Sequence, residues 1–158
     1  MKFKEIFSQF LKNKDKLKII NVASADKHAK PNSAPKMLMD ILGPNRIYFL
    51  DYKFTQTHSN ILKNPQLSLS FMDDENFAGY RLNGKAQILE TGKEYEKVEK
   101  EWEKRVVRYQ ADRIIKRMHG HETAREAEGE LPKNFVVVKF TASEGSVVKP
   151  DRVLRAKE

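Results

Sequence analysis

Short runs of β-type sequence joined by tight turns are the feature that most constrains the fold of this chain. Apolar and polar residues alternate in these runs, as where Leu67, Leu69 and Phe71 alternate with Ser68 and Ser70, which places the two sets on opposite faces of a strand. Short turns between strands favour antiparallel pairing. Six strands are predicted, over residues 17–24, 36–41, 46–51, 66–72, 77–90 and 134–141, followed by a further short strand at 145–148 and a charged tail at 150–158.

Prolines and glycines mark where these strands begin, bend and end. Pro31 and Pro35 lack a backbone N–H group, so the chain leading into the second strand is expected at a sheet edge or beside a ligand. The Gly-Pro-Asn sequence at 43–45 predicts a tight turn. Gly84 marks either a bulge or a close backbone contact inside a long strand.

Two segments show helical periodicity. Residues 2–13 space apolar side chains three or four positions apart, which predicts an amphipathic helix that packs on the domain or binds a membrane surface. Residues 93–126 alternate charges of both signs, which predicts two mostly solvated helices with a break near Gly120. The order of elements predicts one domain over residues 1–158. Its fold class is mainly β (α+β), a six-stranded antiparallel split β-barrel with peripheral helices.

The net charge of +8 comes mainly from the N-terminal part of the chain, because residues 1–36 hold nine lysines and three acidic residues and so carry +6. Salt-sensitive nucleic-acid binding through Lys12, Lys14, Lys16 and Lys18 is one open function, although no aromatic-studded basic strand accompanies them. The absence of cysteine excludes disulfides and thiolate chemistry. Without a signal-peptide pattern or a membrane-spanning apolar run, a soluble cytoplasmic protein is expected.

Residues 46–72 contain the best candidate for a binding site. A strand leads into a hydroxyl-rich turn, a short helix at 59–63, an Asn-Pro pair and another strand. Thr55 and Thr57 lie where the helix begins. Helix N-termini expose unpaired N–H groups and carry partial positive charge, so neighbouring hydroxyls suit a phosphate. The alternative is that Thr55 or Thr57 only caps the helix.

The sequence contains few other motifs for catalysis or ligand binding. It lacks a glycine-rich dinucleotide loop, a Walker loop and a G-x-S-x-G elbow. His58, in the proposed phosphate turn, is read as a phosphate donor, a general acid near a cofactor, or a surface helix residue. His119, His121 and Glu122 would collect a metal only if their segment is irregular, so no metal site is predicted. No catalytic residue stands out, and a bound cofactor would have to carry any reaction.

The order of these elements resembles the pyridoxamine 5′-phosphate oxidase-like flavin-binding split barrels. The resemblance covers about residues 15–92 and includes the segments 19–24, 30–35, 47–52, 55–65, 67–71 and 79–84. It implies a homodimer with FMN held at the subunit interface. It also implies a flavin-dependent oxidoreductase that acts on a small molecule.

Position by position, the resemblance implies a set of cofactor-binding residues. Thr55, Gln56 and Thr57 fall where relatives bind the FMN phosphate, and Arg81 falls on a strand that approaches the cofactor in relatives. The residues expected along the flavin ring and its phosphate arm are Ser33, Ala34, Pro35, Lys36, Phe49, Leu50 and Asp51.

The phosphate turn departs from the pattern of the vitamin B6 oxidase itself. That enzyme has Ser-Arg-Lys where this chain has Thr55, Gln56 and Thr57, and it has an arginine near the position of Ala34 that this chain lacks. The resemblance therefore does not carry the B6 oxidase reaction over, and it leaves substrate and electron donor open. Because the family also includes deazaflavin- and haem-using members, these cofactors and a non-catalytic binder or electron carrier remain alternatives.

Overall fold

The computed structural model describes residues 1–120 and 133–158. These residues form three helices and seven strands. In chain order the elements are α1 (Phe3–Lys12), β1 (Ile19–Ala25), β2 (Pro31–Leu42), β3 (Arg46–Asp51), α2 (Gln56–Lys63), β4 (Gln66–Asp73), β5 (Ala78–Leu89), α3 (Lys93–Met118), β6 (Val136–Lys149) and β7 (Arg152–Lys157).

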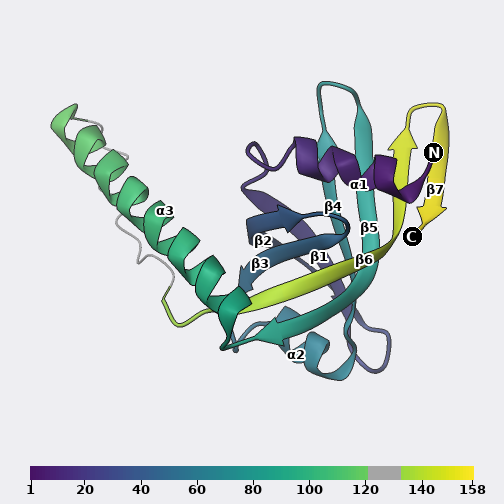
Figure 1. Cartoon of the computed structure of the whole chain (residues 1–158), viewed down its shortest axis with the longest axis horizontal. Coiled ribbons are helices and arrows are strands. Elements are labelled where there is room, and N and C mark those ends of the chain that lie inside the picture. Colours follow the sequence, from purple (N-terminus) through teal and green to yellow (C-terminus); the bar gives the residue numbers. More distant parts are fainter. Residues whose placement is uncertain (121–132) are drawn as a thin grey trace.

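Six strands close into an antiparallel barrel with the helices outside it (Figure 1). Neighbours follow the order β3-β2-β1-β4-β5-β6, and β3 pairs back onto the first half of β6 to close the ring. The second half of β6 leaves β3 and pairs instead with β7, a seventh strand outside the ring. The predicted mainly β fold, with six antiparallel barrel strands and peripheral helices, is confirmed.

The C-terminal part of the chain differs most from the prediction. The strands expected at 134–141 and 145–148 are one continuous strand, β6, and the expected charged tail at 150–158 contains strand β7. Charged residues are common on edge strands because they hinder pairing with further chains. The same charges hide the strand pattern in the sequence, so this part of the prediction was wrong.

Gly84 lies where β5 and β6 approach each other most closely. The pairing register between the two strands shifts at Asn83 and Gly84. A Cβ atom on Gly84 would lie 2.1 Å from the carbonyl oxygen of Thr141, so only glycine fits. The predicted bulge or close contact is confirmed.

Strand β2 begins at Pro31, five positions before the predicted start at residue 36. Residues 31–37 pair with β1 on one side only, because β3 joins β2 from Leu38 onward. This half of β2 therefore has one edge without a strand partner among the described residues, which is where sheets tolerate proline. The edge position expected from Pro31 and Pro35 is confirmed.

Helix α1 packs on the barrel and contributes to its core. The side chains of Phe3, Ile6, Phe7 and Phe10 are at most 4% exposed. The ring of Phe10 meets Phe71 of β4 edge-on, with ring centroids 4.7 Å apart. Burying an aromatic side chain contributes about 2–3 kcal/mol, so packing on the domain, rather than on a membrane surface, uses the apolar face of α1. No helix of the described residues is both long and apolar enough to span a bilayer.

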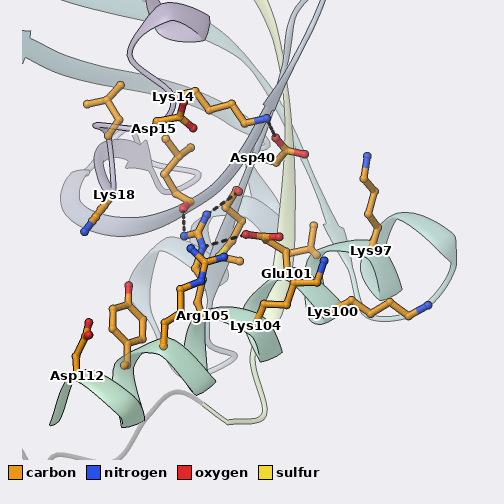
Figure 2. A pocket seen from close by; sticks show the side chains of 16 residues that line it. Lys14, Asp15, Lys18, Asp40, Lys97, Lys100, Glu101, Lys104, Arg105 and Asp112 are labelled. Carbon is orange, nitrogen blue, oxygen red and sulfur yellow. Dashed lines mark hydrogen bonds and ion pairs between the residues drawn. The ribbon is translucent and has the colours of Figure 1, made fainter. Parts of the chain in front are cut away.

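Helix α3 packs on the outside of the barrel at its beginning and extends away from it at its end (Figure 1). Val98 and Trp102 are buried against a second apolar cluster that includes Leu50 of β3. A cleft separates the middle of α3 from β2 (Figure 2). The helix ends at Met118, two residues before Gly120, as predicted; the second helix expected after it falls on residues 121–132, outside the described ones.

Candidate cofactor site

Helix α2 begins with Thr55 as its N-cap. The Thr55 hydroxyl oxygen accepts a hydrogen bond from the backbone N–H of His58 at 3.1 Å, and the hydroxyl donates to Asp51 Oδ1 at 2.8 Å. Thr55 therefore caps the helix. The helix starts at Gln56, three residues before the predicted Ser59, because the cap fixes its first turn.

The first turn of α2 leaves backbone donors without intrahelical partners. The first α-helical hydrogen bond runs from the N–H of Ser59 to the carbonyl of Thr55, so the N–H groups of Gln56 and Thr57 precede the helical ladder. They lie at the positive end of the helix dipole. This is the local geometry that the sequence predicted for a phosphate.

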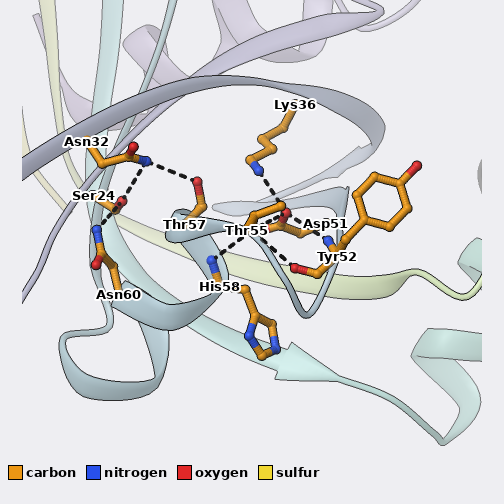
Figure 3. A network of polar contacts seen from close by, with 9 residues as sticks. All are labelled: Ser24, Asn32, Lys36, Asp51, Tyr52, Thr55, Thr57, His58 and Asn60. Atoms are coloured by element: carbon orange, nitrogen blue, oxygen red, sulfur yellow. Dashed lines mark hydrogen bonds and ion pairs between the residues drawn. The ribbon is translucent and has the colours of Figure 1, made fainter.

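A buried polar network fixes this turn against the barrel (Figure 3). The amide nitrogen of Asn32, on β2, donates to the Thr57 hydroxyl at 3.3 Å and to the Ser24 hydroxyl at 3.5 Å. From α2 itself, the amide of Asn60 donates to Ser24 at 3.0 Å. Thr57 is only 1% exposed. Residues of β1, β2 and α2 are thus held together by hydrogen bonds.

Sequence reasoning missed Ser24, Asn32 and Asn60 as members of this site. In β1, the inward positions carry Ile20, Val22 and then Ser24, so the hydroxyl replaces an apolar side chain at a buried position. A hydroxyl at the third buried position of a strand needs a partner. That break in the apolar pattern was the signal available in the sequence.

A buried ion pair joins β2 to β3 beside the same turn (Figure 3). Lys36 Nζ lies 2.7 Å from Asp51 Oδ1, and the two side chains are 9% and 0% exposed. Asp51 Oδ1 also accepts hydrogen bonds from the Tyr52 N–H and the Thr55 hydroxyl. Asp51 Oδ2 is buried and has no hydrogen-bond partner among the described residues. The charge of Lys36 is therefore already balanced within the protein.

The remaining cations near the turn lie further out. Lys53 pairs with Glu90 at 2.6 Å on the surface, and the hydrogen bond from Lys53 lowers the pKa of Glu90. Next to it, the rings of Tyr52 and Phe54 stack with centroids 5.3 Å apart, and Phe54 is 85% exposed. Burial, followed by the charge of Asp51, raises the pKa of the Tyr52 hydroxyl.

The expected site residues other than Arg81 divide into three groups. Ser33, Ala34, Pro35 and Lys36 follow the open edge of β2, and Asp51 with Thr55, Gln56 and Thr57 lies beside that edge. Phe49 and Leu50 are buried in the barrel core and in the cluster under α3, respectively. Neither side chain lines an open surface within one chain.

Arg81 is not brought to this turn within one chain. It is an exposed residue of β5. It lies in one cross-strand row with Ser70, Asn21 and Pro35, the last of which belongs to β2. Three strand spacings separate Arg81 from Pro35, about 14 Å at the usual distance between strands.

Histidines contribute little at this site. The ring of His58 is directed away from Thr57 and Asn32 (Figure 3), and the residue is 8% exposed, so it is not a surface helix residue. Among residues 1–120 and 133–158, no group of three histidine or acidic side chains could hold a metal. Of the alternative set, His119 is the C-cap residue of α3, while His121 and Glu122 lie outside the described residues.

Comparison with known structures identifies the fold. A protein from Clostridium acetobutylicum related to general stress protein 26 of B. subtilis, of the pyridoxinephosphate oxidase family, is 20% identical over 98% of this chain and 95% of its own, with a TM-score of 0.63. PhzG from Burkholderia lata, in complex with tetrahydrophenazine-1-carboxylic acid, is 18% identical over 98% of this chain and 85% of its own, with a TM-score of 0.64.

A third similar structure is an FMN-binding protein from Nostoc punctiforme related to pyridoxamine 5′-phosphate oxidase. It is 12% identical over 97% of this chain and 87% of its own, with a TM-score of 0.59. No curated protein sequence gave a significant match. The sequence profile of the family described as pyridoxamine 5′-phosphate oxidase matches residues 4–149. The chain therefore belongs to the pyridoxamine 5′-phosphate oxidase family.

Proposed function

We propose that this protein binds FMN between two copies of the chain and acts as an oxidoreductase on a small molecule. The observation that carries the proposal is the N-terminus of α2, which meets the open edge of β2 through Asn32 and Thr57. It offers backbone donors and hydroxyls to a phosphate. The similar protein from Nostoc punctiforme, which binds FMN, adds support.

The hydrogen-bond donors at this turn are of the type that binds the phosphate of FMN. The N–H groups of Gln56 and Thr57 supply neutral donors at the positive end of α2, and the Thr57 hydroxyl keeps its own proton available while it accepts from Asn32. Since Thr57 is 1% exposed, the Asn32 side chain must move aside for a phosphate to reach the hydroxyl. The backbone of Ser33 and Pro35, at the open edge of β2 next to Asn32, would flank the rest of the cofactor.

Positive charge for the phosphate is limited within one chain. Lys36 is paired with buried Asp51, and Lys53 is paired with Glu90. Arg81 is exposed but three strands away. We infer that Arg81 reaches the cofactor held by the other copy, and that FMN exchanges readily because the near cations are already paired.

An exposed apolar row supports the homodimer. Met72, Gly79, Val148 and Val153 are directly opposite one another across β4, β5, β6 and β7. Met72 is 60% exposed, and the two valines are each 50% exposed. Arg81 is two residues from Gly79 on the same face of β5. A second copy that covers this row removes its apolar surface from water and brings Arg81 to an interface.

FMN, when bound, supplies the hydride or electron transfer. The chain itself anchors the phosphate, flanks the ring and, through the partner, limits access of water. Near the turn, the charged side chains of Lys36, Asp51, Lys53 and Glu90 are all paired. This pairing favours, as a second candidate, a cofactor carrier in which the protein contributes no acid or base.

Absorbance spectroscopy with mass analysis of the released cofactor tests the proposal first. We expect FMN in the purified protein or, after dialysis, saturable binding of added FMN by a dimer in light scattering. Loss of bound flavin colour with a nicotinamide reductant, followed by reoxidation, supports an oxidoreductase; binding without turnover supports the carrier. A haem or deazaflavin spectrum would show that the cofactor is not FMN. A protein that binds none of the three cofactors would overturn the proposal.

A further inference from the structure

We propose that the cleft between α3 and β2 binds a small phosphorylated ligand with a planar ring, of the nucleotide class. The cleft has a volume of about 570 Å³, within the range of small-molecule sites. It shares no residue with the expected cofactor set, so the proposal is independent of FMN binding. Its 16 lining residues come from α3, from β2 and from the connection between α1 and β1 (Figure 2).

Lysines and an arginine of α3 form one bank of the cleft. Lys97, Lys100, Lys104 and Arg108 follow one another at intervals of three or four residues, which places them along one side of the helix. The opposite bank belongs to the connection that ends α1, with Lys14 and Lys18. Segments about 80 residues apart in sequence thus converge on one volume.

Part of this charge is already balanced. Lys14 is paired with Asp40. Arg105 donates to the carbonyl oxygens of Leu38 at 2.8 Å and Met39 at 3.0 Å, and its Nε lies 3.6 Å from Glu101. These contacts hold the middle of α3 over the bulge in β2, so they shape the cleft rather than leave charge for a ligand.

The remaining charge is positive and available. Among the described residues, Lys18, Lys97, Lys100, Lys104 and Arg108 form no ion pair, while the only unpaired acids of the lining are Asp15 and Asp112. Five cations against two acids leave +3. A concave surface with such an excess attracts anions.

The floor of the cleft is apolar and aromatic. Leu17, Leu38, Met39, Val98 and Tyr109 line it. The ring of Tyr109 lies 6.2 Å from that of Trp102, which is 4% exposed. A planar ring on this floor, with its phosphates toward the α3 lysines, would satisfy both surfaces.

The arrangement favours a small ligand over a nucleic-acid strand. Asp112 follows Arg108 by one helical turn, and Asp15 lies beside Lys14 on the other bank. Both carboxylates would repel the phosphates of a strand that continued past the cleft. Within the lining of the cleft, these two carboxylates therefore interrupt the cationic surface.

Titration with ADP, adenosine and inorganic pyrophosphate tests the proposal, with fluorescence of the single tryptophan, Trp102, and equilibrium dialysis as readouts. We expect one ADP to bind per chain in a saturable way, and adenosine and pyrophosphate to bind more weakly. Added salt should weaken the binding of ADP. The double variant Lys100→Gln/Lys104→Gln should lower the affinity for ADP at least about tenfold.

Lys4→Gln/Lys85→Gln is the matched control, because it removes the same charge from exposed lysines that do not line the cleft. It should leave ADP binding unchanged, and thermal melting should show both variants folded. Equal weakening in the control, or no saturable ADP binding up to about 1 mM, would overturn the proposal. So would a thymidine oligonucleotide of about 20 residues that binds more tightly than ADP.

Discussion

The ion pair beside α2 and the cleft beside α3 both contain lysine, but only the ion pair buries it. Lys36 and Asp51 are 9% and 0% exposed and share hydrogen bonds with the cap of α2. In the cleft, Lys100 and Lys104 face solvent and have no partner among the described residues. Burial makes the first arrangement rigid and sensitive to loss of one partner, whereas exposed charge adds little stability and remains available to ligands.

The largest expected effect comes from breaking the buried pair. Asp51→Ala leaves the ammonium of Lys36 buried without a counter-charge and removes the acceptor of Thr55, so the free energy of unfolding should fall by about 3–5 kcal/mol. Urea unfolding measures it. Glu101→Ala, which removes a partly exposed acid of the cleft, is the comparison and should cost less than about 1 kcal/mol.

The double variant Lys36→Met/Asp51→Leu separates charge from packing. Replacing both partners by apolar groups of similar volume is often neutral in stability, so this variant should recover most of the loss. If the free energy of unfolding of Asp51→Ala lies within about 1 kcal/mol of that of the parent protein, the ion pair is not the structural anchor of the site.

The next effect concerns the floor of the cleft. Arg105→Gln removes the donors to the Leu38 and Met39 carbonyls at the β2 bulge, which should cost about 2 kcal/mol and make Trp102 more accessible to fluorescence quenchers. Arg108→Gln, one turn along the same helix and without an ion-pair partner among the described residues, should change neither quantity measurably. Equal effects of the two variants would show that Arg105 does not hold α3 in place.

Local chemistry was predictable from the sequence, and long-range pairing was not. The N-cap at Thr55, the edge at Pro31 and Pro35, and the close contact at Gly84 depend on backbone rules that act over a few residues. The strand at 152–157 was missed because its stability comes from pairing with β6, not from its own charged sequence.

The candidate site shows the same division. The turn proposed to bind a phosphate could be picked out from the sequence because Thr55 and Thr57 lie at the start of a short helix. The hydrogen bond from the Asn32 amide to Thr57 joins positions 25 residues apart. The hydrogen bond from the Asn60 amide to Ser24 joins positions 36 residues apart. The cleft joins Lys14 and Lys18 to Lys100 and Lys104 across most of the barrel sequence. Contacts of that separation follow from barrel closure, which no local pattern specifies.

A smaller effect should separate cofactor binding from capping at α2. Thr57→Ala removes one hydroxyl donor to the proposed FMN phosphate, so FMN should bind about tenfold more weakly while the circular dichroism spectrum stays that of the parent. Flavin fluorescence titration measures this. Thr57→Ser keeps the hydroxyl and should restore binding; equal affinity of Thr57→Ala and parent would remove Thr57 from the phosphate site.

The smallest expected effect on stability concerns Glu94, a half-buried carboxylate that joins α3 to the barrel. Glu94 accepts hydrogen bonds from the Tyr48 hydroxyl and, at 2.9 Å, from Lys139. Both partners lower the pKa of the Glu94 carboxyl, the Tyr48 bond most. Burial and then Glu94 raise the pKa of Tyr48 to about 12. At 44% side-chain exposure, solvent screening limits the loss in Glu94→Gln to about 1 kcal/mol at pH 7.

The pH dependence of that difference has a definite sign. Because the folded-state pKa of Glu94 lies below its unfolded value, its contribution is present above about pH 4.3 and disappears as the pH falls through the folded pKa. Urea unfolding of parent and Glu94→Gln should therefore differ at pH 7 and converge as the pH falls through the folded pKa of Glu94 and the parent carboxyl is protonated. The stability lost between about pH 10 and 12, as Tyr48 ionises, should persist in Glu94→Gln, because burial is the larger cause of its raised pKa. A difference in the free energy of unfolding that does not shrink as the pH falls below about 4.3 would assign the loss to packing of the side chain rather than to its charge.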